Sequence, residues 1–174
     1  MDKPDTGWIE RETRRAHSDL PEIWTLLDSV CDPEIPVLSL FDLGVLHDIR
    51  QLGGCIKVSI TPTYSGCPAL ETMRDDILKT LSQAGFEDAQ VEVCLSPVWS
   101  SNWMSPEGRR KLKDYGIAPP MKHCRAGDTP DAGIGCPFCG SHNTARLSEF
   151  GATACKAMFT CADCKETFDF FKNI

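Results

Sequence analysis

Four cysteines near the C-terminus have the spacing of a metal site. Cys136 and Cys139 form one C-x2-C pair, and Cys161 and Cys164 form a second pair after twenty-one intervening residues. Two thiolates separated by two residues can turn toward one ion, and two such knuckles complete the tetrahedral set that zinc prefers. The spacing predicts a structural zinc site with no open coordination position. Thiolates alone do not choose between zinc and iron, so a rubredoxin-like iron centre is the alternative.

The cysteine content of the whole chain supports a metal role for these thiols. The sequence has 10 cysteines in 174 residues, and its first residues lack the apolar stretch of a secretory signal. We therefore expect a cytoplasmic protein whose thiols stay reduced, which disfavours a disulfide framework. Cys124 and Cys155 are expected to be packed or incidental thiols, and nothing requires His123 or His142 as a ligand.

Cys67 is a further cysteine whose position suggests chemistry. It stands directly before Pro68 and an amphipathic pattern from Leu70 to Leu81, which places it at the expected N-terminus of a helix. Unsatisfied N–H groups and the helix dipole favour negative charge there. The thiol is therefore expected to ionise readily and to be able to bind iron or a cluster. A buried capping cysteine without reactivity is an equal alternative.

A proline-bounded acidic loop could accompany this thiol. Asp32 and Glu34 flank Pro33, and together with Thr61 they are candidates for an accessory loop beside Cys67. The carboxylates could act as ligand, base or partner contact. Two carboxylates beside a proline more often cap a turn or face solvent, so this assignment stays open.

Two tryptophans and a methionine crowd one polar segment. Trp99, Trp103 and Met104 lie within six residues of one another, among serines and an asparagine. Such side chains anchor protein interfaces when they are exposed, and they fill a core when they are buried. They are candidates for a partner surface, with a core plug as the equal alternative.

The elements that position these residues follow from the apolar pattern. Residues 1–19 show no apolar periodicity and are expected to form a flexible arm. Apolar steps of three and four residues, with Ser105 and Pro106 as a cap and first turn, predict helices over 20–31, 68–85 and 105–116. Alternation predicts strands at 45–50, 56–61 and 91–95, the first two joined as a hairpin by Gly53 and Gly54.

This order of elements predicts an α+β fold. A small mixed-sheet α/β domain, arranged helix-strand-strand-helix-strand, is expected over 20–116, followed by a linker over 117–135 and an all-β, three-stranded zinc ribbon over 136–174. About forty residues bury too little apolar surface to be stable alone. The ion should therefore supply the missing folding free energy of the ribbon.

The charge distribution disfavours some partners. The net charge is −7, residues 20–116 carry eight basic and fourteen acidic side chains, and residues 134–174 carry four of each. Nucleic-acid binding needs clustered Lys and Arg, so no nucleic acid is expected and a DNA-binding ribbon is the disfavoured hypothesis. No apolar run approaches the length of a membrane helix, so no membrane partner is expected. The sequence leaves a homo-oligomer open.

Several motifs resemble known families. The runs Asp32-Pro33-Glu34-Ile35-Pro36, Asp42-Leu43-Gly44-Val45 and Thr61 to Pro68 resemble the small α/β domain of iron-sulfur assembly and targeting factors over residues 20–100. The runs Ser96 to Ser101, Ser105 to Leu112, Tyr115 to Pro120 and Ser148 to Lys156 are similar to the PaaD family of phenylacetyl-CoA epoxidase components. This second likeness covers nearly the whole chain beyond residue 19.

The resemblance implies an accessory role in aerobic phenylacetate catabolism. A chain of this family is expected to act with the other epoxidase subunits, a di-iron oxygenase and its reductase, and to assist maturation of their metal centres. It implies transient iron-sulfur handling at Cys67, with Asp32 and Glu34 nearby. The sequence agrees, because it has neither the carboxylate-histidine helix set of a di-iron catalyst nor a dinucleotide fingerprint. The alternative is an electron-transfer component that binds redox-active iron at the quartet, the four cysteines Cys136, Cys139, Cys161 and Cys164.

Overall fold

The computed structural model describes residues 6–121 and 129–174. The chain divides into two compact units, with the division between Gly108 and Arg109. Among the described residues, none of the helices combines the length and apolarity needed to span a bilayer.

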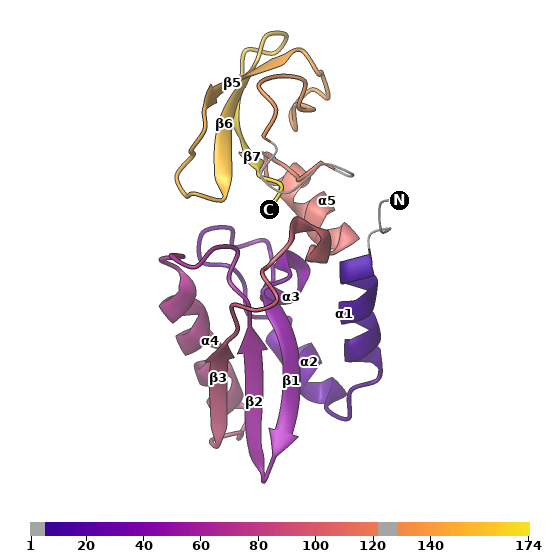
Figure 1. Ribbon diagram of the computed structural model, residues 1–174, viewed down its shortest axis with the longest axis vertical. Helices are drawn as coiled ribbons and strands as arrows, with labels where there is room; N and C mark the ends of the chain where they lie inside the picture. The colour runs from indigo at the N-terminus through magenta and orange to yellow at the C-terminus, as the bar shows by residue number, and fades with distance from the viewer. Residues whose placement is uncertain (1–5, 122–128) are drawn as a thin grey trace. The chain divides into compact units, whose positions relative to one another are not determined.

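A three-stranded mixed sheet organises the first unit (Figure 1). β1 (Leu46–Leu52) and β2 (Cys55–Ile60) form an antiparallel hairpin, and β3 (Ala89–Val93) pairs with β2 in parallel. Gly53 and Gly54 form the hairpin turn with φ values of 60° and 91°, the left-handed conformation that a tight two-residue turn requires. The predicted mixed α/β domain is therefore confirmed.

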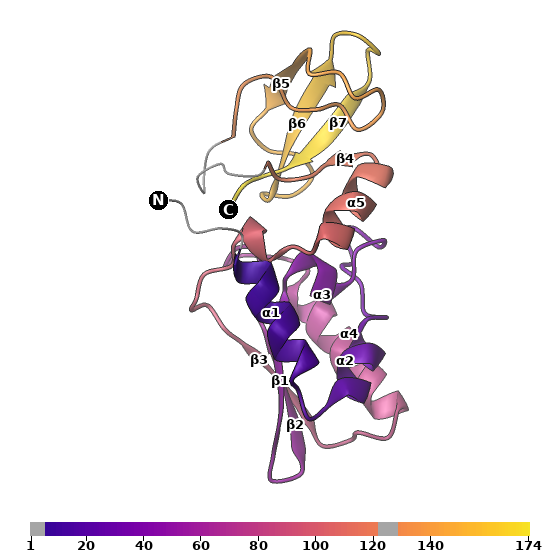
Figure 2. The ribbon, with the colours of Figure 1, turned by 90° about the vertical axis from the view of Figure 1, so that its right-hand side faces the viewer.

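Helices cover one face of this sheet (Figure 2). α2 (Pro21–Leu27) contacts α4 (Leu70–Gln83), α4 lies against β3, and α1 (Thr6–Ala16) runs beside β1. The apolar residues at helical spacing are buried, as the sequence predicts: Ile23 and Leu27 in α2, and Met73, Ile77 and Leu81 in α4. Burial of these side chains with the alternating residues of β2 forms the core of the unit.

Shorter elements complete the chain between the two sheets. α3 (Leu40–Leu43) precedes β1, the 3-10 turn η1 (Ser101–Trp103) follows β3, and α5 (Pro106–Asp114) spans the division between the units. Ser105 caps α5 as predicted, since its Oγ accepts from the Gly108 N–H at 2.8 Å. The same hydroxyl donates to Asp42 Oδ1 at 2.6 Å.

The expected flexible arm is wrong for the part that the structure describes. Residues 6–16 form helix α1, while residues 1–5 lie outside the described residues. α1 is held by a buried arginine rather than by an apolar stripe, because Arg11 is only 2% exposed while Ile9 is 59% exposed. The sequence of α1 therefore lacks the apolar periodicity from which a helix is predicted.

Arg11 ties α1 to three other elements. Its guanidinium donates to the carbonyl oxygens of Trp103 at 2.6 Å, Phe41 at 2.8 Å and Leu46 at 2.8 Å, and it lies 4.7 Å from the centre of the Phe41 ring. Burial lowers the pKa of Arg11 to about 9, so the group stays charged at neutral pH. Backbone carbonyls and an aromatic face thus replace the water that this cation loses.

The second unit is a β ribbon with one strand more than predicted. Its sheet has the order β4-β7-β6-β5, with antiparallel pairing of β5 (Thr144–Ser148), β6 (Lys156–Cys161) and β7 (Thr167–Phe171). The two-residue β4 (Ile117–Ala118) joins the edge of β7 in parallel. The three predicted strands are confirmed, and β4 was too short to show an alternating pattern.

The ribbon core includes residues from the segment that was expected to be a linker. Phe159 stacks on Phe168 at 6.0 Å and meets Phe170 edge-on at 5.6 Å, and Ala118 and Ile134 are buried in the same cluster. The described parts of 117–135 are therefore not a spacer, because they cover one side of the ribbon core. Residues 122–128 lie outside the described residues.

The buried cation gives a prediction for the stability of the first unit. Arg11→Ala leaves two buried carbonyl oxygens and a partly buried one without this donor, so it should lower the free energy of unfolding by about 2–4 kcal/mol. Urea denaturation of the full chain, followed by tryptophan fluorescence, measures this loss. Arg74→Ala is the control, because among the described residues Arg74 has an exposed ion pair with Glu71 at 4.0 Å, and its loss should cost less than about 0.5 kcal/mol. Equal midpoints for the two variants would contradict the anchoring role of Arg11.

Candidate metal centre

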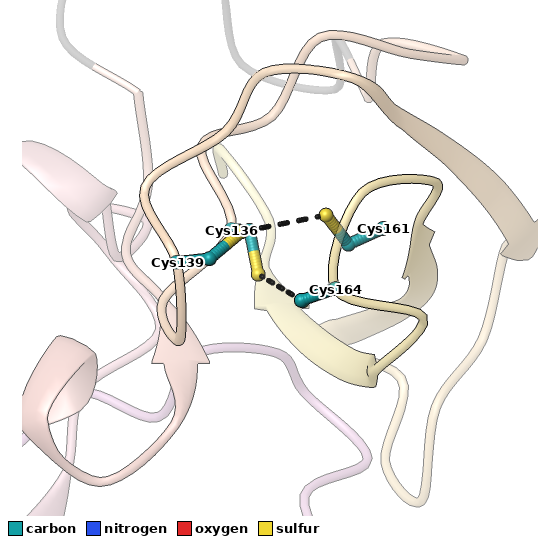
Figure 3. A group of neighbouring side chains, drawn as sticks. All are labelled: Cys136, Cys139, Cys161 and Cys164. Carbon is teal, nitrogen blue, oxygen red and sulfur yellow. Dashed lines mark hydrogen bonds between the residues drawn. The ribbon is translucent and has the colours of Figure 1, made fainter.

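The four predicted ligands converge in the ribbon (Figure 3). The Sγ atoms of Cys136, Cys139, Cys161 and Cys164 all lie within 4.8 Å of one another. Across the two knuckles, Sγ of Cys136 is 3.7 Å from Sγ of Cys164, and Sγ of Cys139 is 3.6 Å from Sγ of Cys161. Zinc–sulfur bonds of about 2.3 Å in a tetrahedron place the sulfurs about 3.8 Å apart. The donor set and its spacing therefore fit one zinc ion.

The two knuckles have the same backbone turn. Cys136 O accepts from the Gly140 N–H at 2.9 Å, and Cys161 O accepts from the Lys165 N–H at 3.0 Å. Both residues after the second cysteine are left-handed, with φ of 76° at Gly140 and 67° at Lys165. Glycine adopts this conformation freely, whereas Lys165 is a non-glycine residue held in it. The repeated turn points both cysteines of each pair toward a common centre.

Backbone dipoles favour the thiolate form of Cys161 in the second knuckle, whereas burial and the neighbouring cysteine side chains raise the pKa of Cys164 to about 12. The N–H of Cys164 has the largest effect on Cys161, and with that of Asp163 it lowers the pKa of the Cys161 thiol to about 7. A thiolate is the form that binds metal, so Cys161 gives up its proton to an incoming ion more easily than Cys164 does.

A polar clamp joins the knuckles outside the sulfur cage. Asp163 accepts hydrogen bonds from the Ser141 hydroxyl and, at 2.8 Å, from the Asn143 side-chain amide, and these bonds lower its pKa. The Ala162 N–H also donates to Asn143 O at 2.8 Å. No sequence signal predicts this clamp, because short polar residues beside a knuckle are common and carry no distinctive spacing.

The remaining candidate ligands in the ribbon have other partners. Cys155 Sγ lies 3.1 Å from Thr153 Oγ1, and His142 Nδ1 lies 2.9 Å from Gly133 O. Neither belongs to the group of converging donor atoms among the described residues. Cys124 and His123 lie outside the described residues.

Cys67 lies in the loop before α4, which begins at Leu70 and not at residue 68 as predicted, and its electrostatics also differ from the prediction. Burial has the largest effect and raises the pKa of the Cys67 thiol, although the backbone N–H groups of Ala69 and Leu70 act to lower it. The carboxylates of Asp32 and Glu34 raise it further. The expectation that this thiol ionises readily is wrong, because half-burial and two neighbouring negative charges outweigh the backbone dipoles.

The acidic loop therefore lies close to Cys67, and its two carboxylates differ in their setting. Asp32 is 6% exposed, and its Oδ1 accepts from the N–H groups of Glu34 at 2.8 Å and Ile35 at 2.9 Å. Asp32 thus stabilises the loop turn, whereas Glu34 is exposed. Thr61 follows β2 directly and is 1% exposed, and its hydroxyl has no hydrogen-bond partner among the described residues.

The tryptophan segment is a core plug, not an exposed surface. Trp99 and Met104 are each 1% exposed, and Trp103 is half-buried. Trp103 fills the space that side chains at Gly7 and Gly44 would need, and its ring lies 5.2 Å from His47. The partner surface proposed for Trp99, Trp103 and Met104 is therefore corrected, because burial takes two of the three away from any partner.

The sulfur cage gives a prediction for the metal. The full chain should hold one zinc ion, and removing it with a chelator should collapse the amide signals of β5, β6 and β7 while those of β1 and β2 persist. Metal analysis and heteronuclear NMR of the same sample measure both effects. Cys161→Ser should reproduce the loss, whereas Cys155→Ser, a thiol in the same unit but outside the cage, should keep full zinc content. Full signal dispersion of the ribbon without metal would contradict a structural site.

Comparisons with known proteins cover both units. The PaaD zinc beta ribbon domain family matches residues 120–172, and the iron-sulfur cluster assembly protein family matches residues 21–93. A crystal structure of a domain of unknown function, DUF59, from Bacillus anthracis is 25% identical with a TM-score of 0.49, and the match covers 60% of this chain and 95% of that one. The quartet lies inside the zinc ribbon match, so its metal is a structural zinc ion.

Relatives by sequence extend this result to most of the chain. An Fe-S protein maturation auxiliary factor of Porphyromonas gingivalis (strain ATCC BAA-308 / W83) is 32% identical over 93 residues, 52% of this chain and 88% of that protein. An Escherichia coli (strain K12) protein, provisionally designated the D component of 1,2-phenylacetyl-CoA epoxidase, is 44% identical over 167 residues, 95% of this chain and 100% of that protein. The chain therefore belongs to the PaaD family of phenylacetyl-CoA epoxidase components, and it joins an iron-sulfur assembly domain to the zinc ribbon of that family.

Proposed function

We propose that the chain is an accessory subunit of a phenylacetyl-CoA epoxidase system and assists maturation of an iron-sulfur or di-iron centre in the oxygenase or reductase subunits. The likeness to an epoxidase component supports membership of the epoxidase system, and the likeness to an Fe-S protein maturation factor supports the maturation role. The proposal gives the epoxidation step to another subunit.

One observation carries the proposal: a half-buried thiol lies beside two carboxylates at the head of α4. Asp32 and Glu34 are close enough to Cys67 for their charges to raise its pKa. Sulfur and carboxylate oxygen are both ligands that iron accepts. The site would therefore hold iron or a cluster through Cys67, with Asp32 and Glu34 supplying negative charge.

The raised pKa of Cys67 suits a transient carrier better than a permanent holder. A metal ion must displace the thiol proton before it can bind, and a higher thiol pKa makes that displacement less favourable. One thiolate in this setting also supplies fewer sulfur ligands than the four of the ribbon cage. Iron bound at Cys67 is therefore expected to pass on to a partner rather than to remain.

The quartet and Cys67 thus have separate tasks in this proposal. The zinc cage stabilises the ribbon, and Cys67 handles iron in the other unit. Zinc has no redox chemistry and the cage leaves no open position, so electron transfer through the ribbon is not part of the proposed function.

The role of Cys67 is tested by removing its sulfur. Cys67→Ser should lower the iron content of the oxygenase and reductase subunits when all are produced together, because the proposed iron ligand is lost. Iron quantification of the purified subunits measures this, with phenylacetate consumption by the cells as a second readout.

Cys94→Ser is the matched control, since Cys94 is also half-buried and also in the first unit. Iron contents of the client subunits should be the same with Cys94→Ser as with the unchanged chain. Full iron occupancy with Cys67→Ser would overturn the maturation role.

The acidic loop gives a prediction for the reactivity of the thiol. Glu34→Gln removes a negative charge that raises the pKa of Cys67, so the variant should hold more thiolate at a given pH and react faster with iodoacetamide. Alkylation rates measured against pH by mass spectrometry of the Cys67 peptide give both pKa values. Glu87→Gln, an exposed carboxylate elsewhere in the first unit, should leave the rate unchanged. A slower reaction of Glu34→Gln would contradict the proximity of Glu34 to the thiol.

A further inference from the structure

The ribbon unit contains a small pocket beside the first zinc knuckle. Its volume is about 260 Å³, and its lining includes Met121, Ala118 and Ile134 together with Cys136 and Gly140 of the knuckle. Ala118, Ile134 and Cys136 also belong to the buried ribbon core, so the floor of the pocket is a fixed apolar surface.

The size of the pocket favours one side chain over a whole ligand. Pockets for small molecules typically have volumes of about 300–1,000 Å³ and enclose most of the ligand. This pocket lies below that range and is large enough for a single leucine or phenylalanine side chain. An apolar side chain presented by a protein segment therefore fits it better than a cofactor does.

The rim of the pocket carries one cationic side chain, that of Lys113. Lys113, in the last turn of α5, is exposed and lines the pocket, and His142 lines it with its Nδ1 held 2.9 Å from Gly133 O. No carboxylate is among the described residues that line the pocket. The rim is therefore complementary to an anionic group placed next to the apolar side chain.

Exposed aromatic side chains stand at the same end of α5. Phe138 of the first knuckle is 56% exposed, and its ring packs on Gly116, where an added Cβ would come within 3.2 Å of the ring. Tyr115, which directly precedes Gly116, is 50% exposed. Exposed aromatic residues on a fixed turn are typical of protein contact sites.

We propose that the first zinc knuckle and the C-terminal end of α5 form a docking site for a partner protein segment in which an apolar side chain stands next to a carboxylate. The apolar side chain enters the pocket over Met121, and the carboxylate pairs with the Lys113 ammonium. Phe138 and Tyr115 extend the contact beyond the pocket. The inference deepens the accessory role proposed above and rests on it, since it assigns the surface that holds an epoxidase subunit.

The zinc ion sets the shape of this surface without touching the partner. Cys136 and Gly140 line the pocket, and their positions follow from the knuckle turn that the metal holds. Docking should therefore require zinc even though the metal site is closed. In this proposal the structural zinc ion contributes to partner binding by holding the residues that line the pocket in place.

The experiment measures binding of the full, zinc-loaded chain to the purified oxygenase and reductase subunits of the same epoxidase by biolayer interferometry. Met121→Ala removes an apolar wall, and Lys113→Glu reverses the rim charge. Each should weaken binding about tenfold or more, the loss expected of a residue at the centre of an interface. Lys113→Glu should also reduce the dependence of binding on salt concentration.

Two matched controls separate docking from general surface effects. Leu147→Ala removes an apolar side chain that is 56% exposed in the same ribbon, and Lys79→Glu reverses a charge near the end of α4. Both should bind as the unchanged chain does, and all variants should retain full zinc content.

Binding unchanged by Met121→Ala and Lys113→Glu, or lost equally in the controls, overturns the docking site. The docking site is also overturned if the unchanged chain binds neither the oxygenase subunit nor the reductase subunit. Chemical-shift changes at Met121 and Ile134 on addition of hexanoate, without an effect of the variants on partner binding, would mean a small-molecule site and also overturn it. Iron content with Cys67→Ser is a separate measurement, so failure of docking and failure of the maturation role are distinguishable.

Discussion

Mutual repulsion among four closely spaced sulfurs is the constraint on which the ribbon depends. Thiolates held within 4.8 Å of one another repel strongly away from bulk water, and a divalent cation at their centre turns that repulsion into attraction. Two of the four sulfurs belong to residues of the ribbon core, beside Phe159 and Phe168. Because two ligands are also core residues, metal binding at the cage and packing of the core should stabilise each other, which suits so small a unit.

In the first unit, Cys67 has surroundings that differ from those of the four zinc ligands. Burial raises the pKa of the Cys67 thiol most, and the charges of two neighbouring carboxylates, rather than neighbouring sulfurs, raise it further. Asp32 owes its position to the turn that it caps, so the charge beside Cys67 is fixed by the backbone of the acidic loop. The same chain thus combines four sulfurs that converge on one metal site with a single thiol whose surroundings disfavour the thiolate.

Much of the fold could be predicted where one side-chain period governs burial. The alternation of Ile56, Val58 and Ile60 gave β2, and the paired cysteines gave the metal ligands. α1 escaped prediction because a polar anchor, Arg11, replaces the apolar stripe. The burial of Trp99 and the ionisation of Cys67 depend on which distant residues surround them, and spacing along the chain carries no record of those neighbours.

The strand β4 and Ile134 have a consequence for handling the ribbon as a fragment. Both precede Cys136, and Ala118 and Ile134 occupy the core beside the aromatic rings. A polypeptide cut just before the first cysteine would keep every zinc ligand and still expose those rings to water. Such a piece would be prone to self-association, so spectroscopy on an excised metal domain should begin with material that starts no later than Arg109.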